Sequence, residues 1–137
     1  MLKYVLAYVA TALAFCALDF AWLTIVAPKF YQAQIGPLLL AKPNLMPALA
    51  FYVLYVAGLV IFCVSPGMTA GEWTRSLVLG ALLGLVAYAT YDLSNLATLK
   101  GWSSSLSLVD MAWGALASAL ASTCGYFGAS LADRFTA

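Results

Sequence analysis

The order of apolar and polar residues divides the chain into four long apolar segments. They cover residues 4–27, 47–64, 76–99 and 106–131. A helix needs about 20 mostly apolar residues to cross a hydrocarbon core of about 30 Å, and in lipid it pairs every backbone N–H and C=O internally. The pattern therefore predicts an all-α integral membrane protein, a four-transmembrane-helix bundle that forms a single membrane domain over residues 1–137.

Proline, glycine and lysine mark the predicted helix ends. Pro28-Lys29 follows the first segment, Ser65-Pro66-Gly67 follows the second and Lys100-Gly101-Trp102 follows the third. Proline has no backbone N–H and its ring clashes with the preceding helical turn, so we expect the first two helices to stop at their prolines. An even number of helices places both termini on the same side of the membrane.

The connection from Pro28 to Pro47 is long and apolar. Its large apolar residues are Phe30, Tyr31, Ile35, Leu38, Leu39 and Leu40. Such a segment is too apolar for a free loop, so we expect an amphipathic piece that lies in the membrane interface and bends at Gly36-Pro37. Two roles are open for it, packing on lipid headgroups and covering a cavity as a lid.

Composition agrees with burial in lipid and narrows the class of partner. Of the residues, 65% are hydrophobic and 8% are charged, against about 25% charged in an ordinary soluble domain. Six Lys and Arg nearly balance five Asp and Glu, so the basic surplus of a nucleic-acid-binding protein is missing. We expect the lipid bilayer as partner and no nucleic acid. The two sides of the predicted bundle carry equal numbers of cations, which leaves the orientation open. Lys3, Arg75 and Arg134 lie on the side of the termini, and Lys29, Lys42 and Lys100 lie on the other.

Residue types that carry metal and cofactor chemistry are absent or dispersed. The sequence has no histidine, no Gly-rich phosphate loop, and three cysteines that fall in different segments, Cys16, Cys63 and Cys124. We therefore expect no metal and no cofactor. Phe15 stands where cleavage before Cys16 would need a small residue, so we expect the first segment to be retained as a helix.

Three carboxylic acids fall inside the predicted helices. They are Asp19, Asp92 and Asp110, and no Lys, Arg or His lies deep in any helix to neutralise them. A charge at the membrane centre costs at least about 2.5 kcal/mol. At about 1.5 Å per residue the acids lie roughly 12, roughly 10 and roughly 6 Å from the same membrane face. Desolvation and like charge favour the neutral acid, so we expect at least one of them to be protonated.

Helical spacing places aromatic and polar side chains beside these acids. Tyr88, Tyr91, Asp92 and Asn95 share one stripe, Trp113 shares a face with Asp110, and Trp22 shares one with Asp19. Tyr52 and Tyr55 fall in the same half of the membrane. We predict a one-sided acidic and aromatic pocket. The candidates for ligand binding or a proton relay are Asp19, Trp22, Tyr52, Tyr91, Asp92, Asn95, Asp110 and Trp113.

Small residues at intervals of four predict close helix packing. Gly80 and Gly84 continue the stripe of the third helix, and Gly114, Ser118 and Ser122 form a seam on the fourth. Such seams join helices within one chain or between two copies. Internal packing and a homodimer are both open.

Several longer motifs accompany these residues. They are YDLSNLATLKGW at residues 91–102, DMAWG at 110–114, LDFAW at 18–22, Phe30-Tyr31, Pro43-Asn44 and FYVLY at 51–55. Together they resemble a family of predicted bacterial membrane proteins catalogued only as a domain of unknown function. The resemblance covers nearly the whole chain. It implies a multi-pass, four-helix protein of the bacterial inner (cell) membrane and no established activity.

Three functions fit the sequence. The first is binding or transport of a small amphiphile or lipid, with one acid exchanging its proton. The second is an enzyme that acts on a lipid or isoprenoid through its aspartates. The third is a structural or oligomerising subunit, in which the acids are hydrogen-bonded register pins between helices.

Overall fold

The computed structural model of the protein describes residues 1–136 and, among them, the side chains of residues 1–132. The first long helix comprises α1 (Leu2–Ala21), the π-helical segment η1 (Trp22–Val26), α2 (Ala27–Ile35) and the 3₁₀ turn η2 (Gly36–Leu38). The second comprises α3 (Leu45–Leu59), the π-helical segment η3 (Val60–Val64) and α4 (Ser65–Ala70). The third and fourth are α5 (Trp73–Thr98) and α6 (Ser104–Thr136).

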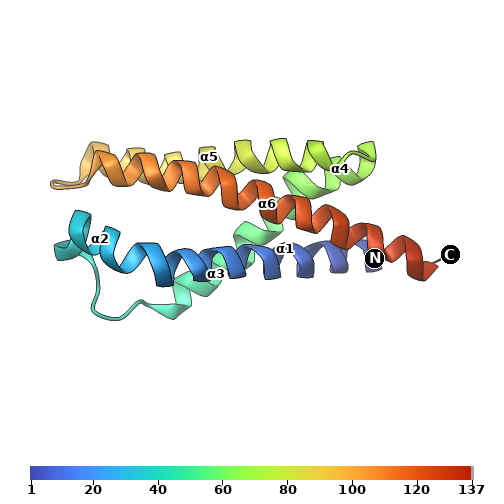
Figure 1. Cartoon of the computed structure of the whole chain (residues 1–137), viewed down its shortest axis with the longest axis horizontal. Coiled ribbons are helices and arrows are strands. Elements are labelled where there is room, and N and C mark those ends of the chain that lie inside the picture. The colour runs from blue at the N-terminus through green and yellow to red at the C-terminus, as the bar shows by residue number, and fades with distance from the viewer. Residues whose placement is uncertain (137) are drawn as a thin grey trace.

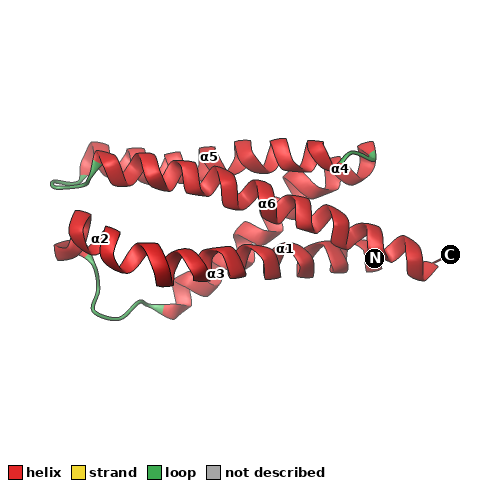
Figure 2. Cartoon of the chain, in the orientation of Figure 1, coloured by secondary structure: helices red, strands yellow, loops and turns green. Residues whose placement is uncertain are grey.

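All four helices are long and apolar enough to cross a membrane, and in the described residues only loops and turns join them (Figure 1, Figure 2). The predicted fold class, an all-α bundle of four membrane-spanning helices, is confirmed. Both chain ends lie at one end of the bundle, and the α2–α3 and α5–α6 connections lie at the other (Figure 1). Arg134, which enters the count of cations by side, lies outside the residues whose side chains are described.

The prediction that proline ends the first two helices is wrong. Helical structure continues through Pro28 to Ile35 and through Pro66 to Ala70. A π-helical segment stands just before each proline, and the backbone N–H of Ala27 and of Ser65 donates five residues back. This wider turn moves the carbonyl that would clash with the proline ring. The segment predicted as a separate interfacial piece is therefore an extension of the first helix as far as the bend at Gly36.

Glycine and asparagine, rather than proline, define the ends of the second helix. Gly71 adopts φ +72°, a left-handed conformation that suits glycine, and Glu72 N–H donates to the Gly67 carbonyl at 3.0 Å. At the start of α3, Asn44 Oδ1 accepts from Met46 N–H at 3.2 Å. The second helix thus spans 45–70 instead of the predicted 47–64.

The long helix α6 is the centre of the bundle. It packs along α5 on one side and along α1 on the other, as Figure 1 shows. The second helix crosses from one flank to the other, because α3 packs on α1 whereas η3 and α4 pack on α5. Near the two interhelical connections, α3 therefore does not fill the space between α1 and α5.

Small residues bring α5 and α6 into backbone contact. A Cβ on Gly84 would lie 2.1 Å from the Gly114 carbonyl oxygen, and one on Gly80 would lie 2.6 Å from that of Ser118. Ser118 Oγ also lies 2.7 Å from the Tyr55 hydroxyl of α3. Both seams, including Ser122, are buried against each other inside one chain.

Candidate functional site

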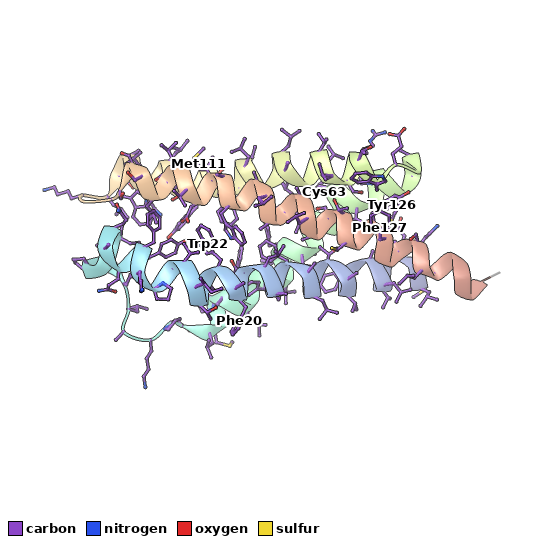
Figure 3. All side chains as sticks on the ribbon, in the orientation of Figure 1. Phe20, Trp22, Cys63, Met111, Tyr126 and Phe127 are labelled. Carbon is purple, nitrogen blue, oxygen red and sulfur yellow. The ribbon has the colours of Figure 1, made fainter. Side chains whose placement is uncertain are left out.

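A cavity of about 480 Å³ lies where α1, α2, α5 and α6 converge, toward the end with the interhelical connections. Its lining residues are Asp19, Trp22, Leu23, Tyr31, Ile35, Leu39, Phe51, Ala87, Tyr88, Tyr91, Trp102, Leu106, Asp110 and Trp113. In Figure 3, Trp22 points from the first helix toward α6, whereas Phe20 points away from the bundle. Phe20 is 70% exposed and faces the surroundings of the protein.

Asp110 lies at the end of a hydrogen-bond chain that joins three segments. Trp22 Nε1 donates to the Tyr31 hydroxyl at 3.0 Å, and that hydroxyl donates to Asp110 Oδ1 at 2.5 Å. The Asp110 side chain is nearly buried, with 5% exposed. These hydrogen bonds hold α2 against α6 and occupy one of the two carboxyl oxygens of Asp110.

The π-helical segment η1 makes this hydrogen-bond chain possible. In a regular helix, nine steps of about 100° would place Tyr31 on the face opposite Trp22. The extra residue of a π-helical turn removes about 100° of that rotation and brings Tyr31 back toward the cavity. Sequence spacing therefore missed Tyr31. The available signal was Pro28, whose ring requires a local change of helical geometry.

Asp19 is the second acid of the cavity wall. It lies on α1, and its Oδ2 accepts the hydroxyl of Tyr52 from α3. Asp110, on α6, lines the same cavity. Within the described residues, no hydrogen bond joins the second oxygen of either acid to another side chain. Two carboxyl groups from different helices thus share one cavity, each with an oxygen left for a ligand.

Aromatic rings form much of the remaining wall. Trp22 and Trp113 stack with their centroids 4.4 Å apart and their planes 11° apart. Tyr91 and Trp102 meet edge to face at 5.6 Å. The ring of Tyr88 covers Gly114, where a Cβ would approach it to 2.2 Å. These side chains give the acids an apolar and polarisable surrounding.

Asp92 is the most buried of the three acids, and it does not line the cavity. Its side chain is 0% exposed, and neither of its oxygens has a hydrogen-bond partner in the part of the chain that is described. Ser107 and Asp110 of α6 are its polar neighbours. The Ser107 hydroxyl accepts from Trp102 Nε1 at 3.1 Å and points its proton at the Ser103 carbonyl at 3.3 Å. Asp92 is therefore an unpaired carboxyl group behind the cavity wall.

The predicted site residues divide into two groups. Asp19, Trp22, Tyr91, Asp110 and Trp113 line the cavity. Tyr52 reaches the cavity only through Asp19, and Asp92 and Asn95 lie outside the lining. The structure adds Tyr31, Tyr88 and Trp102, of which Tyr88 was visible in the predicted stripe. Trp102 follows a predicted helix end, where the sequence offers no periodicity that assigns its direction.

A side-chain hydrogen bond also joins α2 to the α5–α6 connection near the cavity. The Ser103 hydroxyl donates to Gln34 Oε1. Among the described residues, no three His, Cys, Asp or Glu side chains are placed to hold a metal ion. The chemistry that the site supplies is that of two carboxyl groups, tyrosine hydroxyls and aromatic faces.

Replacing Tyr31 by phenylalanine is expected to weaken the attachment of α2 to α6. The change removes the donor to Asp110 and leaves Trp22 Nε1 without its acceptor. Loss of hydrogen bonds to a carboxyl group predicts a loss of about 1–2 kcal/mol in the free energy of unfolding. Unfolding in mixed micelles, followed by circular dichroism, measures this change in the free energy of unfolding. Tyr126→Phe is the control, since its hydroxyl makes no hydrogen bond within the described residues, and it should change stability by less than about 0.5 kcal/mol. Equal stability of the two variants would contradict the role of Tyr31.

Comparison with known proteins places the chain in a family without assigning an activity. No curated protein and no solved structure matches it. A family model described as predicted membrane protein (DUF2177) matches residues 4–127. Because that match covers nearly all of the helical bundle that builds the cavity, the chain belongs to the DUF2177 family of predicted membrane proteins.

Proposed function

We propose that this membrane protein binds a small amphiphile or lipid in the cavity, with Asp19 and Asp110 holding the polar group. The volume of about 480 Å³ falls within the range of about 300–1,000 Å³ typical of small-molecule sites. Aromatic and aliphatic side chains surround the two acids and suit an apolar body. If the ligand is also transported, one acid would exchange its proton for it.

One observation carries the proposal: two acids from different helices, α1 and α6, converge on a single cavity within the membrane-spanning bundle. Acids that only fix helix register would have their oxygens satisfied by neighbouring helices. Here each acid accepts one tyrosine hydroxyl, and the cavity adjoins both carboxyl groups. That arrangement is typical of a binding site.

The exposed lining residues support entry from the bilayer. Leu23, Leu39, Phe51 and Tyr91 line the cavity and are between 41% and 57% exposed. A ligand dissolved in lipid would reach the acids between these side chains. We further propose that the bilayer is the bacterial inner membrane, as the family resemblance implies, with both termini on one side because they lie at one end of the bundle (Figure 1).

Quenching of tryptophan fluorescence by brominated probes tests binding. Three probes with the same bromohexyl chain serve: the trimethylammonium, the alcohol and the carboxylate. In lipid nanodiscs, at least one is expected to quench saturably, because Trp22, Trp102 and Trp113 line the cavity. Partitioning into lipid alone gives quenching that rises without saturation.

A matched pair of alanine variants locates the binding. Ala87 lines the cavity and Ala89 does not, although both are half-buried on α5. Ala87→Leu is expected to abolish saturable quenching because it fills the cavity, whereas Ala89→Leu should retain it. The proposal fails if no probe quenches saturably, or if Ala87→Leu binds as well as Ala89→Leu.

A further inference from the structure

We infer that the ligand of this cavity is a lipophilic organic cation, an amine or quaternary ammonium with an apolar body, and that it competes with protons for the two acids. The inference rests on the proposed binding function and adds the charge of the ligand. Three features of the cavity carry it: its charge balance, its aromatic wall and the donors that already contact the acids.

The side chains that line the cavity include acids but no cation. Of its lining residues, Asp19 and Asp110 are ionisable acids, and none is Lys or Arg. Lys29, Lys42 and Lys100 are exposed and do not line it. An ionised carboxylate in a low-dielectric interior needs an opposite charge nearby. In this cavity the opposite charge comes from a bound proton or from the ligand.

The aromatic wall suits a diffuse positive charge. Trp22, Trp113 and Tyr88 lie beside the acids, and Tyr91 and Trp102 form the edge-to-face pair. The negative face of an aromatic ring attracts ammonium groups, and the attraction is strongest where water is excluded. A carboxylate together with several rings recognises an alkylammonium better than a neutral alcohol of the same length.

The tyrosine hydroxyls leave the negative charge in place. Tyr31 and Tyr52 donate hydrogen bonds to Asp110 and Asp19, and a neutral donor stabilises a carboxylate without cancelling its charge. An anionic ligand would meet two acids and no cation, so the cavity disfavours it. A neutral donor ligand would repeat what the tyrosines already supply.

Competition with protons follows from the groups that face the two acids. From α1 and α6 these are Asp19 and Asp110 themselves, from α2 and α3 the hydroxyls of Tyr31 and Tyr52, and from α5 Asp92, Tyr88 and Tyr91. The group contains no base besides the carboxylates. Protonation of the acids removes the charge that holds a cation, so lowering the pH weakens cation binding.

The three bromohexyl probes measure this preference directly. At about pH 8 the trimethylammonium probe is expected to bind at least about tenfold more tightly than the alcohol, and the carboxylate should bind least. Lowering the pH to about 3, below the ordinary aspartic acid pKa of about 3.9, should reduce the cation's affinity and leave that of the alcohol within about twofold. Saturable binding of the alcohol or carboxylate as tight as that of the cation overturns the charge assignment and leaves the proposed binding function standing.

Replacing aspartate by asparagine, which removes the charge and keeps the shape, tests which acids cause the preference for the cation. Asp110→Asn is expected to reduce the preference for the cation over the alcohol to within about threefold, with Asp19→Asn as the second variant should the first not fold. Glu72→Gln removes an acid from the exposed turn between α4 and α5 and should retain the full preference. An unchanged preference in both aspartate variants overturns the inference.

Discussion

Replacing Gly84 by alanine is expected to disrupt the packing of α5 against α6. A Cβ at this position would lie 2.1 Å from the Gly114 carbonyl oxygen and 2.6 Å from Ser118 Oγ. The nearer atom belongs to the backbone, so relief requires the two helices to separate along their seam. Overpacking of this kind costs about 1–3 kcal/mol, and occasionally more. We expect a loss of at least about 2 kcal/mol in the free energy of unfolding.

Gly58→Ala is the matched control for this variant. Gly58 lies inside α3, and the nearest atom to its added Cβ is Phe62 Cδ2 at 4.0 Å, an ordinary contact. Alanine is a better helix former than glycine by up to about 1 kcal/mol, so Gly58→Ala should be neutral or stabilising. Unfolding of both variants in mixed micelles gives the comparison. Similar stabilities would contradict the close backbone contact between α5 and α6 at Gly84.

Replacing Asp92 by valine is expected to stabilise the bundle. The carboxyl group is fully buried on α5, and neither oxygen accepts or donates a hydrogen bond within the described residues. Burying a polar group without a partner costs about 1–3 kcal/mol in proteins, and valine fills a similar volume without that cost. We expect the free energy of unfolding to rise by about 1–3 kcal/mol.

Asp110→Val provides the opposite case. Asp110 accepts from Tyr31, so its loss leaves that hydroxyl and the α2 contact unsatisfied and should lower stability. The pair compares an acid that is hydrogen-bonded across helices with one that is buried without a hydrogen-bond partner in the described residues. If Asp92→Val is less stable than the parent protein by as much as Asp110→Val, Asp92 contributes to helix packing and its burial is structural.

The sequence predicted several residues that line the cavity, but it did not predict how the helices arrange them. Asp19 and Asp110 stood out because an unpaired acid in an apolar segment is costly whatever the helix contacts. Helical spacing added Trp22 and Trp113, which stack on each other in the structure. Helical spacing could not add Tyr31, because the π-helical segment η1 rotates every later residue of the helix to a different face, and the apolar pattern does not reveal that segment.

The two prolines also show that a local sequence rule can fail to predict helix geometry. As a local rule, proline predicted helix ends at Pro28 and Pro66, since its ring and missing N–H disturb a regular helix. In the structure, π-helical segments place i to i−5 hydrogen bonds just before both prolines. The helix beyond each segment packs on a neighbour, α4 on α5 and α2 on α6, and this packing favours continuation of the helix past the proline. A rule that considers neighbours in sequence alone cannot include that contribution.

The sequence by itself determined the solvent of this protein, the number of its spans and the half of the bundle that holds its acids. Each of these depends on local composition and on the fixed rise of a helix. The tertiary structure alone decided which acids share a cavity and which one is sealed behind it. The positions of the acids relative to the cavity depend on how each helix is rotated about its axis. They also depend on the crossing of the second helix from α1 to α5 and on the π-helical turn at η1. They separate Asp19 and Asp110, which line the cavity, from Asp92, because contacts between helices depend on packing and not on position along the chain.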